Sequence, residues 1–201
     1  MFDYQIILKE IEALKWADKY LDYVQLRNKG LKKKAQIKLG EFFADFILQN
    51  KSSRREFIDL INKVAFTTND YSAYLPFNMH RDLLLPEIID WIKDEPLNPI
   101  PYKWSSKWED NKKSLELNPQ DQIAIEKFAN YVIGKISMNQ HELPHGYPYD
   151  GNADGDASLI DFFEKFALNI TDVEKQKKIL NTLAELKQCA IRYGLSEKRR
   201  S

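Results

Sequence analysis

The sequence predicts an all-α protein of about eight to nine helices packed as antiparallel pairs. Three observations support this fold class. Only seven of the 201 residues are glycine. Apolar residues recur at helical spacing along nearly the whole chain, and no segment alternates apolar and polar residues as a strand does. A single helical domain spanning residues 1–201 accounts for this pattern, and a subdivision near residue 96 is compatible with it.

The first half of the chain contains three predicted helices. The first covers about residues 3–28 and ends at Gly30, which takes the position after the C-cap. The sequence SRRE at residues 53–56 has capping-box spacing and is expected to open the third. A segment rich in Thr, Asn, Ser and Tyr, about residues 67–77, is expected to be a loop. The second helix is marked by apolar residues at helical spacing, which are Leu31, Ala35, Leu39, Phe42, Phe46 and Ile47.

Prolines mark the breaks that follow. Pro86 either begins a helix or kinks a longer one. Pro96, Pro99 and Pro101 form a second boundary before a short aromatic helix over residues 102–117. Asn118-Pro119 separates that helix from a longer one that ends near Gln140. The next helix is expected to begin near Leu159, and Thr171 is expected to cap the last helix.

Composition narrows the classes of function. Lys+Arg and Asp+Glu both number 30, so the net charge is zero. Proteins that bind a nucleic acid duplex are usually basic, so nucleic acid is not expected as the main partner. Cys189 is the only cysteine, which excludes an internal disulfide and suits a reducing compartment. The N-terminal sequence MFDYQIILKEIEALKW has acids among its apolar residues, so no signal peptide or membrane span is predicted and a cytoplasmic location is expected.

The stretch HELPH, which begins at His141, matches the H-E-x-x-H pattern of zinc proteases. In that pattern one helix face presents both histidines to zinc, and the glutamate acts as general base. Here Pro144 breaks the helix that this chemistry requires. We therefore expect a helix that ends near Gln140 with His141 capping its carbonyls, Leu143 packed on the core and Tyr147 half-buried. A zinc hydrolase is the weaker alternative.

The stretch DGNADGDASLID follows and has the spacing of a calcium loop, with Gly155 at the sixth position. The oxygen-bearing residues at its ligand positions are Asp150, Asn152, Asp154, Asp156, Ser158 and Asp161. The stretch departs from the EF-hand pattern at two points. Asp161 stands at the twelfth position in place of the usual glutamate, and the preceding residues, PHGYPY, cannot form the helix that leads into such a loop. The alternative is a helix start, because Asp, Asn and Gly form turns and acids favour a helix N-terminus. On this alternative, Asp156 or Ser158 caps the next helix.

One segment of the second half carries a family resemblance. The sequence KKSLELNPQDQIAIEKFANYVI resembles the junction between tetratricopeptide repeats, with Ser114 where the repeat usually has alanine, followed by Leu115, Leu117, Asn118 and Pro119. No second copy in phase accompanies it, so it resembles a degenerate, solitary unit. The whole chain is also similar to uncharacterised bacterial helical proteins. The resemblance to a tetratricopeptide unit implies a helical groove that binds other proteins or peptides, whereas the similarity of the whole chain implies no known activity.

Two groups of side chains are candidates for contact with a partner. Basic residues gather at the first helix junction, where no acid lies between Arg27 and Lys38. This group includes Arg27, Lys32, Lys33 and Lys34. It could meet an acidic protein or an RNA backbone, and a solvated helix end is the alternative. Trp104 and Trp108 are candidates because tryptophan is enriched at binding hot spots, and core packing is the alternative.

These features predict a non-catalytic bacterial protein that binds another protein. An immunity or antitoxin protein that neutralises a toxin domain is one concrete version, and an adaptor is another. No catalytic residue is assigned, because the sequence contains no Gly-rich phosphate loop and no nucleophile beside a base. The alternative is a metal-binding protein with a calcium-type loop at residues 150–161.

Overall fold

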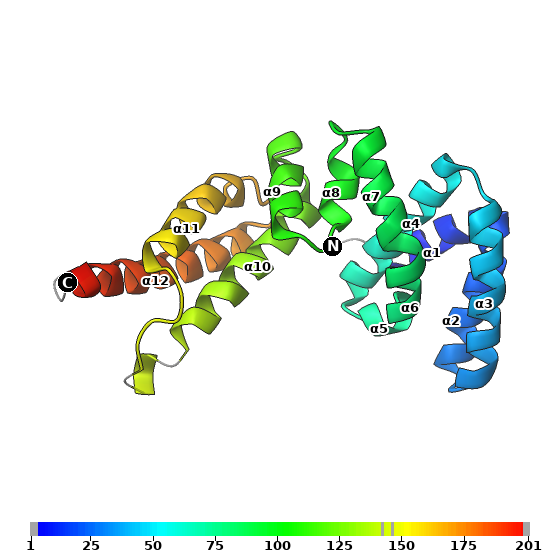
Figure 1. Cartoon of the computed structure of the whole chain (residues 1–201), viewed down its shortest axis with the longest axis horizontal. Helices are drawn as coiled ribbons and strands as arrows, with labels where there is room; N and C mark the ends of the chain where they lie inside the picture. Colours follow the sequence, from blue (N-terminus) through cyan, green and yellow to red (C-terminus); the bar gives the residue numbers. More distant parts are fainter. Residues whose placement is uncertain (1–3, 142, 146, 199–201) are drawn as a thin grey trace. The chain divides into compact units, whose positions relative to one another are not determined.

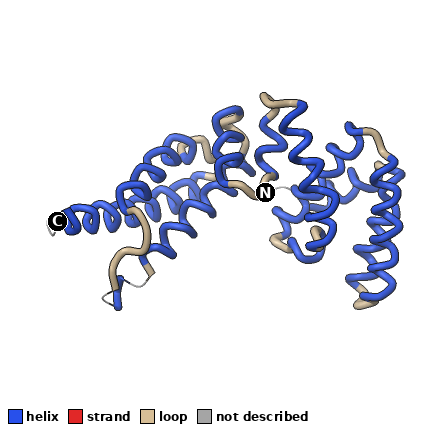
Figure 2. Tube along the Cα trace, viewed as in Figure 1, coloured by secondary structure: helices blue, strands red, loops and turns tan. Residues whose placement is uncertain are grey.

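The computed structural model describes residues 4–141, 143–145 and 147–198. Every regular element in these ranges is helical and none is a strand (Figure 2). The predicted all-α class is therefore confirmed. None of the helices in the described ranges combines the length and the apolar character that crossing a membrane requires.

The chain divides into two compact units, Met1–Ser105 and Ser106–Ser201. The division falls after Ser105 and not near residue 96, because α8 (Pro99–Trp104) packs against α7 (Leu85–Asp94) and α4 (Lys51–Thr68) of the first unit. The proline-rich boundary thus lies inside the first unit. The other helices of this unit are α1 (Tyr4–Ala13), α2 (Asp18–Asn28), α3 (Lys32–Leu48), α5 (Tyr71–Tyr74) and α6 (Phe77–Met79) (Figure 1).

The first predicted helix is broken in two. Leu14 has a non-helical backbone, with φ −80° and ψ 82°, and a 3-10 turn over Lys15–Ala17 leads into α2. The break lets α1 pack against α4 while α2 forms an antiparallel hairpin with α3 (Figure 1). It also places Trp16 against Phe42, with ring centroids 5.8 Å apart. Contacts with distant helices have overridden a continuous helical pattern here.

Aromatic side chains form the centre of the first unit. Tyr20, Phe42 and Phe57 are fully buried, and neighbouring rings in this group lie 5.0–5.4 Å apart. The hydroxyl of Tyr20 donates a 2.8 Å hydrogen bond to the carbonyl of Tyr74. This bond fixes the segment predicted to be a loop against α2. Within that segment the short helix α5 forms, and Asp70 is its N-cap.

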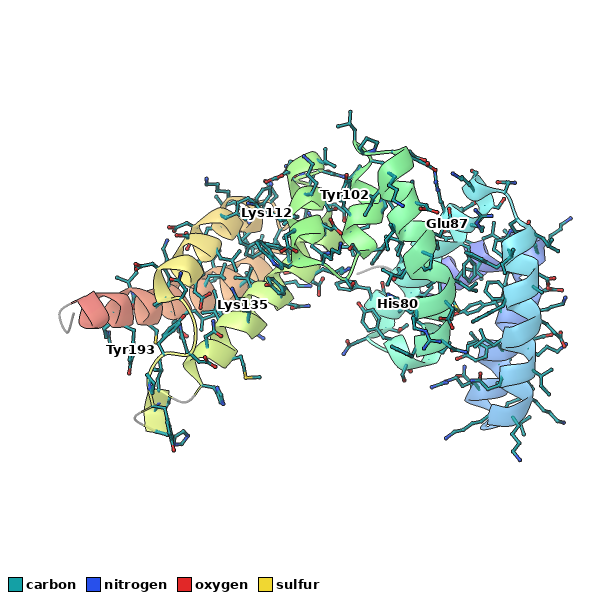
Figure 3. The ribbon with its side chains drawn as sticks, viewed as in Figure 1. His80, Glu87, Tyr102, Lys112, Lys135 and Tyr193 are labelled. Carbon is teal, nitrogen blue, oxygen red and sulfur yellow. The ribbon has the colours of Figure 1, made fainter. Side chains whose placement is uncertain are left out.

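The start of α4 differs from the prediction. Asn50 caps this helix, because its side chain accepts from the backbone N–H of Ser53 at 3.0 Å. The predicted capping box at residues 53–56 is therefore wrong, and its two arginines have another role. Arg54 and Arg55 both pair with the buried carboxylate of Glu87 on α7, at 2.7 and 3.3 Å (Figure 3).

Pro86 lies inside a longer helical run. A π turn over His80–Leu84 connects α6 to α7, and Pro86 is the second residue of α7. A wider turn before the proline changes the backbone hydrogen bonding at the place where proline lacks an N–H. Pro86 therefore lies in the first turn of α7, which agrees with its predicted role at a helix start, while the helical backbone at Leu84 continues into the π turn.

The second unit contains four long helices, α9 (Trp108–Leu117), α10 (Gln122–Gln140), α11 (Ala153–Ala167) and α12 (Val173–Lys198). The helix predicted over residues 102–117 is thus two helices, because α8 ends at Trp104 and α9 begins at Trp108. Helices α11 and α12 pair along their lengths, and α10 packs against both and against α9. The buried core includes Phe128 and Phe163.

Asp172 caps α12, because its carboxylate accepts from the backbone N–H of Lys175 at 3.0 Å. The predicted cap, Thr171, is wrong by one residue. Thr171 instead donates its backbone N–H to the side-chain oxygen of Gln122 at 3.0 Å. This contact fixes the α11–α12 turn against the start of α10.

Candidate functional site

The predicted calcium loop forms the start of a helix. Asn152 caps α11, because its side-chain oxygen accepts from the backbone N–H of Gly155 at 2.9 Å. The helix begins at Ala153, six residues earlier than expected, so neither Asp156 nor Ser158 is its cap. A calcium loop needs non-helical backbone to turn its ligands toward one point. Helical spacing here separates those residues into an exposed set, Asp154, Ser158 and Asp161, and the buried Asp156.

The buried carboxylate of Asp156 is surrounded by protein donors. Only 2% of Asp156 is exposed. Its Oδ2 accepts from the hydroxyl of Tyr149 at 2.8 Å and from the amide of Asn139 at 2.7 Å. The ammonium of Lys135, on α10, lies 3.3 Å from Oδ1 (Figure 3). Both oxygens of Asp156 therefore contact groups of the chain itself.

The other predicted calcium ligands do not converge on a common point. Asp161 pairs with Lys187 of α12, which also lies 3.0 Å from Glu164. Asp150 is exposed, and its backbone N–H donates to the carbonyl of Asn139 at 3.0 Å. Among the residues that the structure describes, no group of three or more His, Cys, Asp or Glu side chains is placed to hold a metal ion.

In the segment between α10 and α11, two of the expected features of a helix end are present, the His141 cap and the packing of Leu143. The Nδ1 of His141 lies 2.7 Å from the carbonyl of Met138, so His141 caps the end of α10 as predicted. A 3-10 turn over Leu143–His145 follows, which separates the two histidines of HELPH. Glu142, the predicted general base, lies outside the described residues. Leu143 packs on a small cluster with Tyr149, which confirms its predicted place.

Tyr149, not Tyr147, is the buried aromatic of this connection. Tyr149 is 6% exposed and Tyr147 is 61% exposed, so the expectation of a half-buried Tyr147 is wrong. Burial raises the pKa of the Tyr149 phenol, and the hydrogen bond from Gln140 opposes that rise. A cavity of about 460 Å³ is lined by Tyr147, Pro148, Tyr149 and Asp150. None of these four residues forms a nucleophile–base pair.

The two candidate tryptophans belong to different units and have different surroundings. Trp104 is 3% exposed, and its indole N–H donates to Asp59 at 2.7 Å. It is therefore part of the core of the first unit. Trp108 is 40% exposed and stacks on Tyr131, with centroids 6.3 Å apart. Core packing, the alternative considered for this pair, accounts for Trp104.

The predicted basic group lies where α2 ends and α3 begins. Lys32, Lys33 and Lys34 are the first three residues of α3, and all three are exposed. Arg27 is partly buried, and its guanidinium donates to the hydroxyl of Tyr23 at 3.3 Å. No acid lies in the first turn of α3. Positive charges at a helix N-terminus are disfavoured by the helix dipole, so the three lysines do not stabilise α3 itself.

The outer side of α3 carries an apolar stripe that the sequence pattern did not predict. The inner side, Ala35, Leu39, Phe42 and Phe46, is buried against the rest of the unit. We define the α3 outer face as Lys33, Ile37, Gly40, Ala44, Ile47 and Leu48, all of which are exposed. Ile37 is 63% exposed, Ile47 66% and Leu48 81%. Ile47 is one of the apolar residues that mark this helix in the sequence, and it is exposed because it lies about 100° around the helix from the buried Phe46.

The helical positions of the outer face could have revealed it. Residues 33, 37, 40, 44 and 47 follow one another at intervals of four and three, which places them on one side of a helix. No protein-family model, curated protein sequence or solved structure matches this chain. Function must therefore be inferred from side chains such as these.

Proposed function

We propose that this chain is a non-catalytic protein whose function is to bind another protein through the α3 outer face. The observation that carries the proposal is the exposure of Ile37, Ile47 and Leu48 on one side of a helix whose other side is already buried. A surface helix normally presents charged residues opposite its buried face. A helix that is apolar on both sides is typical of one covered on both sides.

Burying the α3 outer face in a complex would contribute substantially to the free energy of binding. Fully burying an aliphatic side chain of this size stabilises a complex by about 1.5–3 kcal/mol before the costs of association. Contiguous exposed apolar side chains commonly mark interaction sites in soluble domains. Lys32, Lys33 and Lys34 add a positive group at one end of the face.

Neutralisation of a toxin domain is one concrete version of this function, and an adaptor is the other. A tetratricopeptide-like origin of α9 and α10 agrees with either one, since such units bind proteins or peptides. An adjacent toxin-domain gene would select the first version. A cytoplasmic location is part of the same proposal.

The test is affinity capture from the source cell with matched variants. The double substitution Ile37→Glu/Ile47→Glu places charge on the outer face. The control Leu97→Glu/Val173→Glu changes two other apolar residues that are 80% and 70% exposed. Each protein is first checked for helicity and melting temperature, which exposed substitutions should change little.

We expect the parent and the control to recover one protein in stoichiometric amount. The outer-face variant should recover at least about tenfold less, a change of about 1.4 kcal/mol in binding. Recovery of no stoichiometric protein by the parent would refute the proposal. Equal recovery by the parent and the outer-face variant would refute it as well.

A further inference from the structure

We infer that the segment docking on the α3 outer face is an amphipathic helix of a different protein, with carboxylates at the end that meets Lys32, Lys33 and Lys34. This inference rests on the proposed function and specifies the chemistry of the partner. Three features of α3 support it. They are the spacing of its outer residues, the small residues Gly40 and Ala44 at the centre of the outer face, and the three lysines at its N-terminus, which have no acid beside them in the first turn.

The spacing of the outer face fits a helical partner. The intervals of four and three from Lys33 to Ile47 are those of the a and d positions of a coiled-coil seam. Such a seam stays in contact with one facing helix over two heptads. An extended strand repeats every two residues and would not match this spacing.

Gly40 lies in the middle of the seam, on the same exposed side of α3 as Ile37 and Ile47. Glycine in a helix interior is destabilising by roughly 0.5–1 kcal/mol relative to alanine. A Cβ added at Gly40 would have no neighbouring atom within 4 Å, and the backbone there is ordinary α-helix. Ala44 follows one turn later and is also exposed. Because Gly40 and Ala44 have small side chains, another helix could approach the backbone of α3 closely between Ile37 and Ile47.

The three lysines at the N-terminal end of the outer face would be complemented by carboxylates on the partner. Lys32, Lys33 and Lys34 stand at the helix end where positive charge is disfavoured. None of the three has an ion-pair partner within the described part of the chain. Carboxylates from a partner would offset both the repulsion among the lysines and their interaction with the helix dipole.

A second copy of this chain does not supply that chemistry. An antiparallel copy centred between Gly40 and Ala44 would bring the lysines of one chain to residues 48–52 of the other. Those residues are Leu-Gln-Asn-Lys-Ser, and the carboxylate beside them, Asp94, already pairs with Lys51 at 2.7 Å and with Arg55. A parallel copy would bring lysines against lysines, which is repulsive.

A membrane surface also fits less well than a helix. Helices that lie in the bilayer interface insert large side chains such as Trp, Phe and Leu from their apolar face. The α3 outer face has no aromatic residue, and its centre consists of Gly40 and Ala44. Small residues at the centre favour close contact with another helix over insertion into lipid.

The first experiment measures the affinity of the captured partner for two outer-face variants. Lys32→Gln/Lys33→Gln/Lys34→Gln neutralises the positive end, and its control neutralises three other exposed lysines, Lys165, Lys177 and Lys178. Gly40→Leu adds a large side chain at the centre of the outer face, and its control is Gly134→Leu, another helical glycine with open space around it. We expect each outer-face variant to bind about tenfold more weakly and each control to bind like the parent. The loss in the lysine variant should shrink at high salt because screening weakens exposed charge pairs.

The second experiment identifies what lies on the face. A photoreactive benzophenone side chain at Gln36, beside the seam, is cross-linked in the captured complex, and the attached peptide is sequenced. Attachment to a helical segment with two or more carboxylates at one end supports the inference. Attachment to a strand or loop, or to another copy of this chain, overturns it. Flotation of the parent with phosphatidylcholine–phosphatidylserine vesicles, if abolished by Ile37→Glu/Ile47→Glu, would assign the face to membranes and also overturn it.

The failures of the two proposals are distinguishable. If Ile37→Glu/Ile47→Glu abolishes capture while the lysine and Gly40 variants bind normally, protein binding stands and the acidic-helix partner is refuted. If the parent captures no partner, or the Ile37/Ile47 variant captures it equally, both proposals fail together.

Discussion

The hydroxyl of Tyr149 donates a 2.8 Å hydrogen bond to the buried carboxylate of Asp156, seven residues further along the chain. The amide of Asn139 donates to the same oxygen at 2.7 Å. Gly151 lies between the two partners with φ of +113°, and a Cβ there would come within 3.0 Å of the Asn139 amide. Glycine at 151 thus lets the segment between α10 and α11 pass close to Asn139 of α10. Asp156 then links the two, because it accepts hydrogen bonds from both Asn139 and Tyr149.

Tyr149→Phe should destabilise the protein by about 1–3 kcal/mol, because it removes a donor to a buried carboxylate. Urea unfolding followed by circular dichroism measures the change. The control is Tyr147→Phe at an exposed position, which should alter the free energy of unfolding by less than about 0.5 kcal/mol. Equal effects of the two substitutions would contradict the assigned role of Tyr149.

Alkaline pH should weaken the fold through the same phenol. Burial raises the pKa of Tyr149 in the folded chain, against about 10 for an exposed tyrosine in the unfolded chain. A raised folded pKa gives stability that is complete below the unfolded pKa and is lost as the pH rises above it. Urea midpoints measured from about pH 9 to about pH 11 should therefore fall less for Tyr149→Phe than for the parent. Parallel curves for the two proteins would refute this contribution.

The helices were predictable because helical spacing is a local property of the sequence. Gly30 was placed correctly after α2, where its φ is +76°. The break at Leu14 was not predictable, because it depends on Trp16 stacking against Phe42 of another helix. Local apolar spacing shows that a helix exists, and it does not show which distant side chain will interrupt it.

The candidate surface was only partly predictable for a related reason. Charge alone singles out the lysines at 32–34, and their exposure agrees both with a contact group and with a solvated helix end. The exposure of Ile47 was not predictable, because apolar character does not show which side of a helix its neighbours cover. The acidic spacing at residues 150–161 was ambiguous, since Asn152 serves equally as a loop ligand and as a helix cap.

Calcium should leave the stability of the protein unchanged. Asp156 contacts Tyr149 and Asn139, and Asp161 contacts Lys187, so these carboxylates already have donors in the folded chain. An ion that binds only the native state must raise its stability. We expect equal melting temperatures with millimolar calcium and with a chelator, for the parent and for Asp150→Ala. A rise in the parent that Asp150→Ala abolishes would restore the calcium loop.

The two tryptophans should respond differently to truncation. Trp104→Ala removes a buried ring and is expected to destabilise the protein by about 3–5 kcal/mol. Trp108→Ala removes a ring that is 40% exposed and stacked on Tyr131, so the expected loss is about 0.5–1.5 kcal/mol. Chemical unfolding of both variants tests the ranking. A milder effect at Trp104 than at Trp108 would contradict the placement of Trp104 in the core.

Gly40→Ala and Gly134→Ala should each stabilise the isolated protein by roughly 0.5–1 kcal/mol, because alanine favours a helix interior more than glycine does. Both positions have ordinary helical backbone and room for a Cβ, so neither substitution should introduce strain. Thermal melts of the free protein check this, and a loss of stability at Gly40 would show that the chain itself requires that glycine. If both stabilise as expected, the fold of the free chain requires neither glycine. The same pair then separates stability from binding, because alanine at 40 should raise the melting temperature of the free protein and lower its affinity for the partner helix.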